Sequence, residues 1–170
     1  MESFIPEKET CPYCNSMGNC HIHAYYFRNL LWFDGTSQVC YRLRILRVKC
    51  SGCGHTHAIL PDVIIPYACY GIQFILKVLS EHLSKASTAG SVCTKYGISQ
   101  ALFFRWLRIL RKDKRIFLGL LNNQTTALSD FLQNILASDF CNFSAEFILL
   151  TARSFLQVHK NPAIYRQTVF

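Results

Sequence analysis

The chain has 170 residues, of which 51% are hydrophobic and 14% aromatic, and its net charge is +8. This length fits one domain or two small ones, and the composition excludes a disordered chain. No apolar run reaches the roughly 18 residues that cross a bilayer. The acidic N-terminus also lacks the pattern of a secretory signal. We therefore expect a soluble cytoplasmic protein with no membrane partner.

The cysteines point to a metal rather than to disulfides. There are nine, and an odd number in a reducing compartment argues against a disulfide framework. Two pairs, CPYC and CSGC, each have two residues between the thiols, a spacing that directs two thiolates at one ion. Asn15 and Gly54 follow the pairs and tolerate the left-handed backbone that such a turn needs. The prediction is one Zn²⁺ held by Cys11, Cys14, Cys50 and Cys53.

Unligated thiols and a redox site are the alternatives to zinc at these pairs. Nearby histidines add further candidates. His55 and His57 lie two apart and would share one face of a strand, where we interpret them as polar positions beside the metal. Replacement of a thiolate, or contact with phosphate, is the other interpretation. Cys20, His21 and His23 form a similar group, and a second zinc there is the weaker hypothesis.

The 35 residues between the two pairs predict a hairpin. Residues 24–33 are aromatic and apolar, as in a strand, and DGTS at 34–37 is typical of a hairpin turn. Residues 39–49 read as the returning strand, in which the adjacent Ile45 and Leu46 break the alternation and indicate a bulge or strong twist. Residues 55–61 could add a third strand. Cysteine pair, hairpin, cysteine pair and strand together predict a zinc ribbon over residues 1–66.

The positive charge is concentrated in the middle third of the chain, where the pattern becomes helical. Residues 71–115 carry nine basic and two acidic side chains. Apolar residues from Ile72 to Leu83 recur every three or four positions and predict a first helix. Such a segment presents either a solvated face or a surface for a polyanion, of which nucleic acid is the commonest.

The segment that follows fits a helix-turn-helix, within a predicted region of residues 67–118. Gly97 supplies the positive φ of the turn, Cys93 is small enough for two helices to approach, and Ser99 stands where an N-cap belongs. Four apolar residues would face the core: Phe103, Trp106, Leu107 and Leu110. The opposite face would then meet the major groove of DNA. The alternative is an ordinary amphipathic helix whose arginines are solvated.

Arg105 and Arg108 are the candidates for base contacts, because a guanidinium can grip guanine through two hydrogen bonds. Phe104, on the same side, would meet a thymine methyl or pack elsewhere in the protein. The remaining cations would hold phosphates. The full predicted DNA-binding set is Ser99, Gln100, Arg105, Arg108, Arg111, Lys112, Lys114 and Arg115, with Arg42 and Arg44 from the returning strand.

Residues 119–170 are rich in Phe and Leu and predict C-terminal helices. One helix should run from Thr125 to about Ser138, and a second, capped by Ser144, to about His159. These helices either pack against the middle region or form a surface for self-association or a partner. No nucleophile motif is present, and the scattered carboxylates do not form the cluster that metal-dependent phosphoryl transfer needs. We therefore expect no enzymatic activity.

The motifs CPYC, RVKCSGCGHTHAILPDVIIPY and FFRWLR together resemble the zinc-ribbon and helix-turn-helix region at the front of bacterial transposases. They resemble more closely the small stand-alone, DUF6431-like proteins of bacterial mobile elements. The similarity covers about residues 11–115. It implies a bacterial cytoplasmic protein that binds the ends of an element. Because a nuclease domain has no room in 170 residues, the resemblance implies binding without strand transfer.

The expected fold is α+β, with a small antiparallel zinc ribbon followed by an all-α helix-turn-helix domain and C-terminal helices. The leading hypothesis is a sequence-specific protein for double-stranded DNA, acting as a regulator or as a mobile-element protein. It would act as a homodimer or with a transposition or recombination partner. The alternative is a protein adapter that uses the zinc ribbon and Phe-rich helices, its basic surface meeting RNA or an acidic partner. A metal-dependent enzyme is the third hypothesis.

Overall fold

The computed structural model describes residues 4–61, 63–112, 114, 127–137, 140–151, 154–156 and 164–166. It is an α+β fold, as predicted. The β elements are β1 (Cys20–Phe33), β2 (Gln38–Cys50), β3 (Thr56–Pro61) and β4 (Ile164–Arg166). The helices are η1 (Pro6–Lys8), α1 (Ile72–Leu83), α2 (Ala89–Tyr96), α3 (Gln100–Lys112), α5 (Leu128–Ala137) and α6 (Phe140–Thr151). No described helix has the length and apolarity needed to span a membrane.

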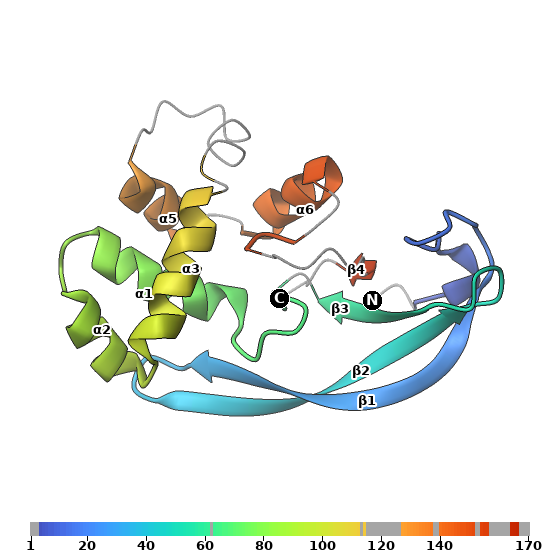
Figure 1. The fold of residues 1–170 in the computed structure, drawn as a ribbon, viewed down its shortest axis with the longest axis horizontal. Helices are drawn as coiled ribbons and strands as arrows, with labels where there is room; N and C mark the ends of the chain where they lie inside the picture. Colours follow the sequence, from blue (N-terminus) through green and yellow to red (C-terminus); the bar gives the residue numbers. More distant parts are fainter. Residues whose placement is uncertain are drawn as a thin grey trace.

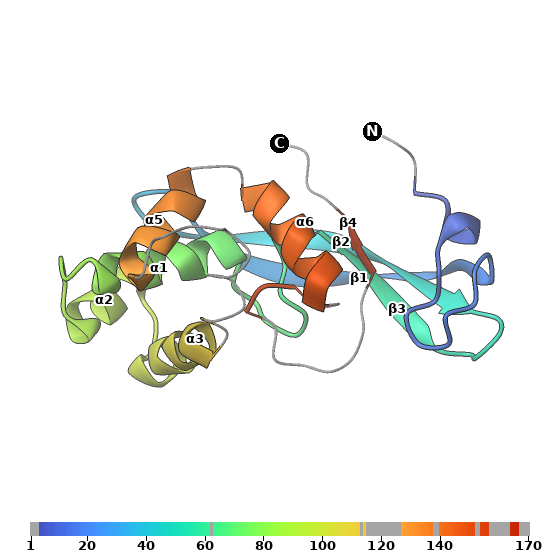
Figure 2. The same cartoon turned by 90° about the horizontal axis from the view of Figure 1, so that it is seen from above.

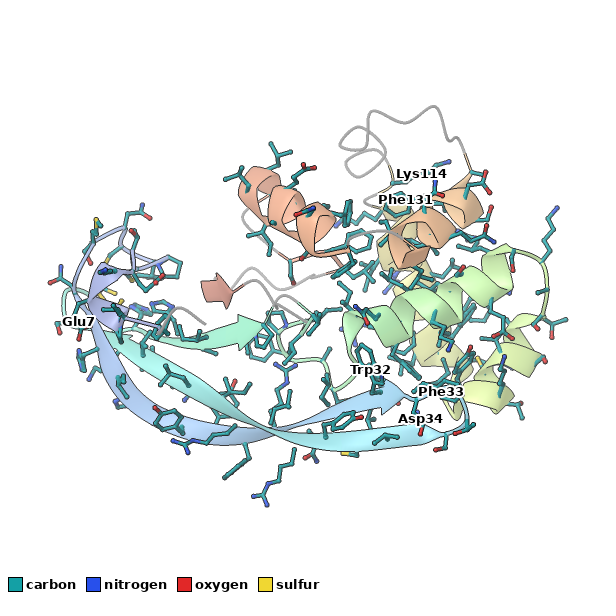
Figure 3. All side chains as sticks on the ribbon, turned by 180° about the vertical axis from the view of Figure 1, so that it is seen from behind. Glu7, Trp32, Phe33, Asp34, Lys114 and Phe131 are labelled. Atoms are coloured by element: carbon teal, nitrogen blue, oxygen red, sulfur yellow. The ribbon has the colours of Figure 1, made fainter. Side chains whose placement is uncertain are left out.

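A long ribbon of β1 and β2 runs along the molecule, with α1, α2, α3 and α5 at one end and the cysteine-bearing loops at the other (Figure 1). The sheet order is β1-β2-β3-β4, antiparallel except for the parallel pairing of β4 with β3. At the hairpin, the Asp34 carboxylate accepts hydrogen bonds from the backbone N–H groups of Thr36 and Ser37, at 2.8 and 2.9 Å. Figure 3 shows Asp34 at the hairpin and Glu7 near the opposite end of the ribbon.

The adjacent apolar residues Ile45 and Leu46 interrupt the alternation of β2 because each face of this strand packs against a different core. Ile45 lies in the main core, which includes residues of α1 and α3. Val48 and Cys50, on the other face, lie in a small core beside the cysteine loops, and Leu46 packs against it. The irregularity in pairing lies in β1, between Ile22 and Ala24, rather than at residues 45 and 46 of β2.

Helices α1, α2 and α3 pack together at the hairpin end. Gly97 ends α2 with φ 61°, and the hydroxyl of Ser99 accepts the backbone N–H of Leu102 at 3.2 Å at the start of α3. The buried Cys93 accepts, through its carbonyl, the N–H of Ile98 at 3.0 Å. The side chain of Gln38, in β2, donates to the Tyr96 carbonyl at 3.0 Å and so ties the ribbon to this turn. Seen from above, α3 lies at the edge of the helical group (Figure 2).

The C-terminal helices differ in part from the prediction. The described α5 begins at Leu128, and the predicted start at Thr125 lies outside the described residues. The prediction that Ser144 caps a helix is wrong, because α6 begins at Phe140 and buries Ser144 within it. The predicted end at His159 also lies outside the described residues. Five phenylalanines of this region are buried in the main core: Phe131, Phe140, Phe143, Phe147 and Phe155.

Candidate metal centre and basic surface

The two cysteine pairs sit in loops with the same backbone hydrogen bonds. In the first, the Cys11 carbonyl accepts the N–H of Asn15, and the Cys11 N–H donates to the Ser16 carbonyl, both at 2.9 Å. In the second, the Cys50 carbonyl accepts the N–H of Gly54, and the Cys50 N–H donates to the His55 carbonyl, again at 2.9 Å. Asn15 and Gly54 have φ of 58° and 74°, as the sequence predicted. Each loop thus turns tightly enough to point both sulfurs the same way.

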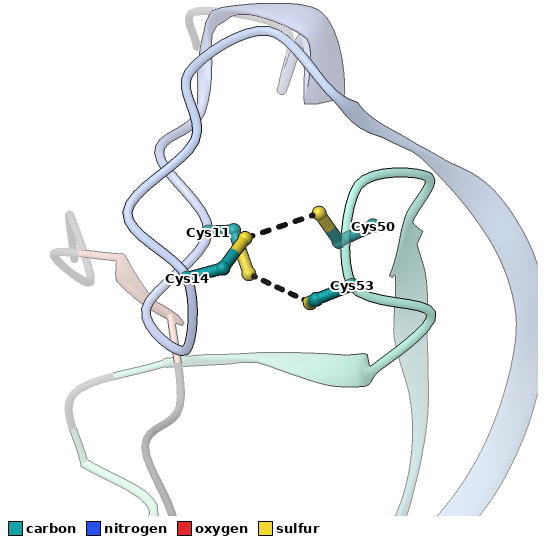
Figure 4. Close-up of side chains that lie close together, drawn as sticks. All are labelled: Cys11, Cys14, Cys50 and Cys53. Atoms are coloured by element: carbon teal, nitrogen blue, oxygen red, sulfur yellow. Dashed lines mark hydrogen bonds between the residues drawn. The ribbon is translucent and has the colours of Figure 1, made fainter.

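The two loops face each other, and their four sulfurs meet (Figure 4). The Sγ atoms of Cys11 and Cys53 are 3.7 Å apart, as are those of Cys14 and Cys50. All four sulfurs lie within 4.8 Å of one another. Ligands about 2.3 Å from a tetrahedral ion are about 3.8 Å apart. These four cysteines therefore could hold one metal ion, which was the sequence prediction for Cys11, Cys14, Cys50 and Cys53.

The ionisation of the thiols is uneven in the absence of a cation. The Ser16 hydroxyl, 3.0 Å from the Cys14 sulfur and 3.4 Å from that of Cys50, lowers the pKa of both thiols, that of Cys50 to about 6. At Cys53 the backbone of His55 lowers the pKa, but burial and the other thiols outweigh it and raise the pKa to about 12. The pKa is therefore lowered at one thiol of each loop, and a bound cation would favour the thiolate form of its ligands.

The histidines beside the cluster do not share a face, contrary to the sequence expectation. His55 precedes β3, is exposed, and stacks on Tyr13 with ring centroids 3.6 Å apart. His57 is within β3, is 4% exposed, and places Nε2 3.3 Å from the Cys11 sulfur. The contact of His57 with a sulfur of the cysteine cluster, like that of Ser16, is a feature that the sequence did not predict. The only hint was the short distance of each from a cysteine pair.

The predicted group at Cys20, His21 and His23 does not assemble a second site. Cys20 is buried opposite Cys50 in the small core, whereas His21 and His23 are exposed. Among the described residues, the only cluster of three or more metal-binding side chains is the four-cysteine group. Apolar burial at this end is slight: the small core contains Cys11, Cys20, Val48 and Cys50, with four partly buried neighbours. Contacts other than apolar burial, among them the Tyr13–His55 stack and the cysteine cluster, therefore join the two loops.

A row of cations occupies the outer side of α3. The burial of this helix follows the prediction, with Phe103, Trp106, Leu107 and Leu110 inside and Phe104 50% exposed. The exposed predicted DNA-binding residues here are Ser99, Gln100, Arg105, Arg108, Arg111 and Lys112. Lys114 is half-buried, and Arg115 lies outside the described residues. Helix α3 contains no acidic residue, so the charges that this helix contributes to the surface are all positive.

A second basic surface lies on the ribbon. Arg42 and Arg44 are exposed, as are their aromatic neighbours in β1. The Arg42 guanidinium lies 4.2 Å from the Phe27 ring centroid, and that of Arg44 lies 4.0 Å from the centroid of Tyr25. Stacking fixes the guanidinium planes and leaves their N–H edges toward solvent. The α3 and ribbon sets are on separate elements, and nothing in the described contacts joins them into one patch.

Comparison with protein families supplies one match. Residues 11–97 match a family described as a domain of unknown function, DUF6431. The chain belongs to the DUF6431 family. The matched segment runs from the first metal-site cysteine to the glycine that ends α2, so α3 lies beyond it. Comparison of this DUF6431 protein with curated proteins and with solved structures gives no match.

Proposed function

We propose that this DUF6431 protein binds double-stranded DNA through a helix-turn-helix formed by α2 and α3, with a zinc ribbon as its second module. The observation that carries the proposal is the exposed row of cations on α3, which directly follows a turn of suitable geometry. In a helix-turn-helix, the second helix enters the major groove with its N-terminal residues at the base edges. The exposed residues from Gln100 to Arg108 occupy that part of α3.

Zinc is the metal we infer for the four-cysteine cluster. A set of four thiolates at tetrahedral spacing is typical of structural zinc, and a site with four protein ligands has no open position for catalysis. The ion would stabilise the loops at the far end of the ribbon. Arg42 and Arg44 would then offer the ribbon as a second contact with phosphate. The resemblance to transposase front regions favours a role in a bacterial mobile element or in regulation.

The test begins by selecting duplexes from a random library with the zinc-loaded protein. Affinity for a selected and a scrambled duplex is then measured across a salt series. Wild type should prefer the selected duplex and bind it with a steep salt dependence, because phosphate contacts release counterions. Replacing Arg105 and Arg108 together by Ala should remove about 1–3 kcal/mol of discrimination per arginine.

The matched control is the double variant Lys8→Gln and Lys77→Gln, which removes two positive charges from exposed sites on η1 and α1. It should keep its preference for the selected duplex. If the Arg105 and Arg108 variant discriminates as well as wild type, α3 is not the recognition helix. If no duplex is enriched by wild type, the proposal of sequence-specific binding fails.

A second candidate function, a protein adapter, draws support from one feature of α6. The phenylalanines that suggested it are buried, but Leu149 and Leu150 are 84% and 66% exposed. Adjacent exposed leucines on a helix are typical of a contact surface. Replacing both with Ser should leave DNA binding unchanged but abolish any protein copurifying with the wild type. Retention of that protein by the variant would exclude α6 as the adapter surface.

A further inference from the structure

A cleft of about 750 Å³ lies between the cysteine loops, the ribbon and the segment that leads from β3 to α1. Its volume falls within the range of small-molecule sites. Each of these parts of the chain contributes side chains with aromatic or cationic groups. The six that carry the argument are Tyr13 and His55 from the cysteine loops, Tyr26, Arg28 and Arg47 from the ribbon, and Tyr67 from the connecting segment.

The aromatic side chains offer flat surfaces at the cleft. Tyr13 and His55 are stacked with an interplanar angle of 22°, so the two cysteine loops contribute one double-layered wall. Tyr67, from a different part of the chain, is 70% exposed. Base–aromatic stacking is worth about 1–3 kcal/mol per base in single-strand sites and tolerates any base, because every base has a π-face. The cleft is therefore suited to a planar aromatic ligand.

The charge of the cleft is of one sign. Its described lining contains the cations Arg28 and Arg47 and no aspartate or glutamate. The exposed Arg47 holds its guanidinium 5.1 Å from the Tyr26 ring centroid, which orients the cation. Arg28 instead donates hydrogen bonds to the carbonyls of Ile65 and Ala68, and so secures the segment that carries Tyr67. A planar ligand that also bears a negative group matches this lining best.

Tyr67 adopts a backbone conformation that its own side chain disfavours. Its φ is 62°, in the left-handed region where a bulky residue is a rare outlier. Strained residues of this kind concentrate at ligand-binding sites, where the surrounding structure holds them. Tyr67 thus combines a disfavoured backbone conformation with a largely exposed ring at the cleft.

We propose that this cleft binds an unpaired nucleotide, its base stacked on the ring of Tyr67 and its phosphate held by Arg47. The nucleotide could be a free nucleoside monophosphate or the unpaired end of a DNA strand, which share the same base and phosphate. The proposal deepens the proposed function, on which the strand-end source rests. In this proposal, α3 binds the DNA duplex, and the cleft binds a nucleotide that is no longer paired in the duplex.

The experiment compares five probes on the zinc-loaded, full-length protein. Thymidine monophosphate, thymidine and inorganic phosphate are titrated by calorimetry. A blunt duplex and the same duplex with a short single-stranded overhang are titrated by fluorescence anisotropy. The monophosphate should bind more tightly than thymidine or phosphate alone, or the overhang more tightly than the blunt duplex. The first result assigns a free nucleotide and the second assigns a strand end.

The decisive variant is Tyr67→Gly, which removes the ring and also relieves the backbone strain. It should remain folded, as thermal unfolding will show, and yet lose about tenfold in affinity for the preferred probe. Arg47→Gln should lose a similar factor, and Tyr67→Phe should retain affinity. The control is Tyr41→Ala, which removes an exposed tyrosine of β2 that does not line the cleft. Its affinity for the same probe should equal that of wild type.

The proposal is overturned if Tyr67→Gly and Arg47→Gln bind the preferred probe as wild type does. It is also overturned if phosphate alone binds as tightly as the monophosphate and the overhang adds nothing. If the protein binds no duplex but binds the monophosphate, and the cleft variants weaken that binding, this inference is supported and the proposed function is rejected. If duplex binding requires Arg105 and Arg108 and no probe binds more weakly to the cleft variants, the proposed function is supported and this inference is rejected.

Discussion

The Nε2 atom of His57 lies 3.3 Å from the Sγ atom of Cys11, and both side chains are buried. Four thiolates around a divalent ion carry a net charge of −2, so an N–H donor to a buried sulfur offsets part of that charge. Groups that hydrogen-bond to metal ligands orient those ligands and typically change metal affinity by 10- to 100-fold. If the four cysteines hold the proposed ion, His57 would strengthen the site without being one of its four ligands.

We predict that His57→Phe lowers zinc affinity by about tenfold, because the ring keeps the volume but loses the N–H. Competition with a chromophoric chelator measures the zinc affinity. The half-time for transfer of zinc from the protein to the chelator should also be shorter for the variant. His23→Phe is the matched control, because it replaces an exposed histidine of β1 that is not part of the four-cysteine cluster. Equal affinities for the two variants would remove His57 from the metal site.

Cys14→Ser should reduce bound zinc well below one ion per chain and lower the melting temperature of the protein. The Cys14 side chain is exposed, so the substitution removes a ligand with little loss of packing. Stability at this end should depend on the ion, because the small core there is slight. Metal analysis and thermal unfolding provide the measurements.

Cys40→Ser, at an exposed cysteine of β2 away from the cluster, should leave both zinc content and melting temperature unchanged. Chelation of the wild type should reproduce the effect of Cys14→Ser on stability. If the chelated protein melts at the same temperature as the zinc-loaded one, the ion does not stabilise the fold.

The sequence was sufficient for features whose causes are local. The two cysteine spacings, the positive φ at Asn15, Gly54 and Gly97, and the apolar period of α1 are each set by a few adjacent residues. The structure has all of them where they were predicted. The meeting of the four sulfurs also followed, because a hairpin of matched strands returns the chain to its starting end.

Features that depend on distant parts of the chain were not predictable in this way. Strand β4 pairs with β3 across about a hundred residues, and three residues carry no distinctive pattern. Ser144 resembles an N-cap in sequence, but packing of the surrounding phenylalanines extends α6 past it. The faces of β2 contact separate cores, which a single alternating pattern cannot reveal. The cleft combines parts of the chain whose proximity only the fold determines.

A pair of glycine substitutions tests the turn between α2 and α3. Gly97→Ala should destabilise the protein by about 1 kcal/mol, because φ 61° disfavours any Cβ. Gly90→Ala should instead stabilise it by about 0.5–1 kcal/mol, since Gly90 is inside α2 and an added Cβ meets its nearest atom at 3.8 Å. Chemical denaturation of both variants at pH 7 measures the difference. Equal effects at the two sites would contradict the left-handed turn.

Glu81, in α1, should make the stability of the helical group depend on pH. Its carboxylate accepts hydrogen bonds from Lys95 and from the buried Tyr96, both at 2.8 Å. Burial raises the pKa of Glu81, but these bonds and that from Ser87 outweigh it and hold the pKa below its ordinary value. Burial and the Glu81 charge raise the pKa of Tyr96, so its hydroxyl stays a donor at neutral pH.

A carboxylate whose pKa is lowered by folding stabilises the fold above its unfolded pKa and loses that effect as pH falls through its folded pKa. Glu81→Gln should therefore cost about 1–3 kcal/mol at pH 7, from hydrogen bonds that lose their charged acceptor. The gap between variant and wild type should shrink below roughly pH 4. Urea denaturation at several pH values measures it, with Glu146→Gln, an exposed glutamate of α6, as the control. A gap that is constant from pH 7 to pH 3 would show that the charge of Glu81 contributes nothing.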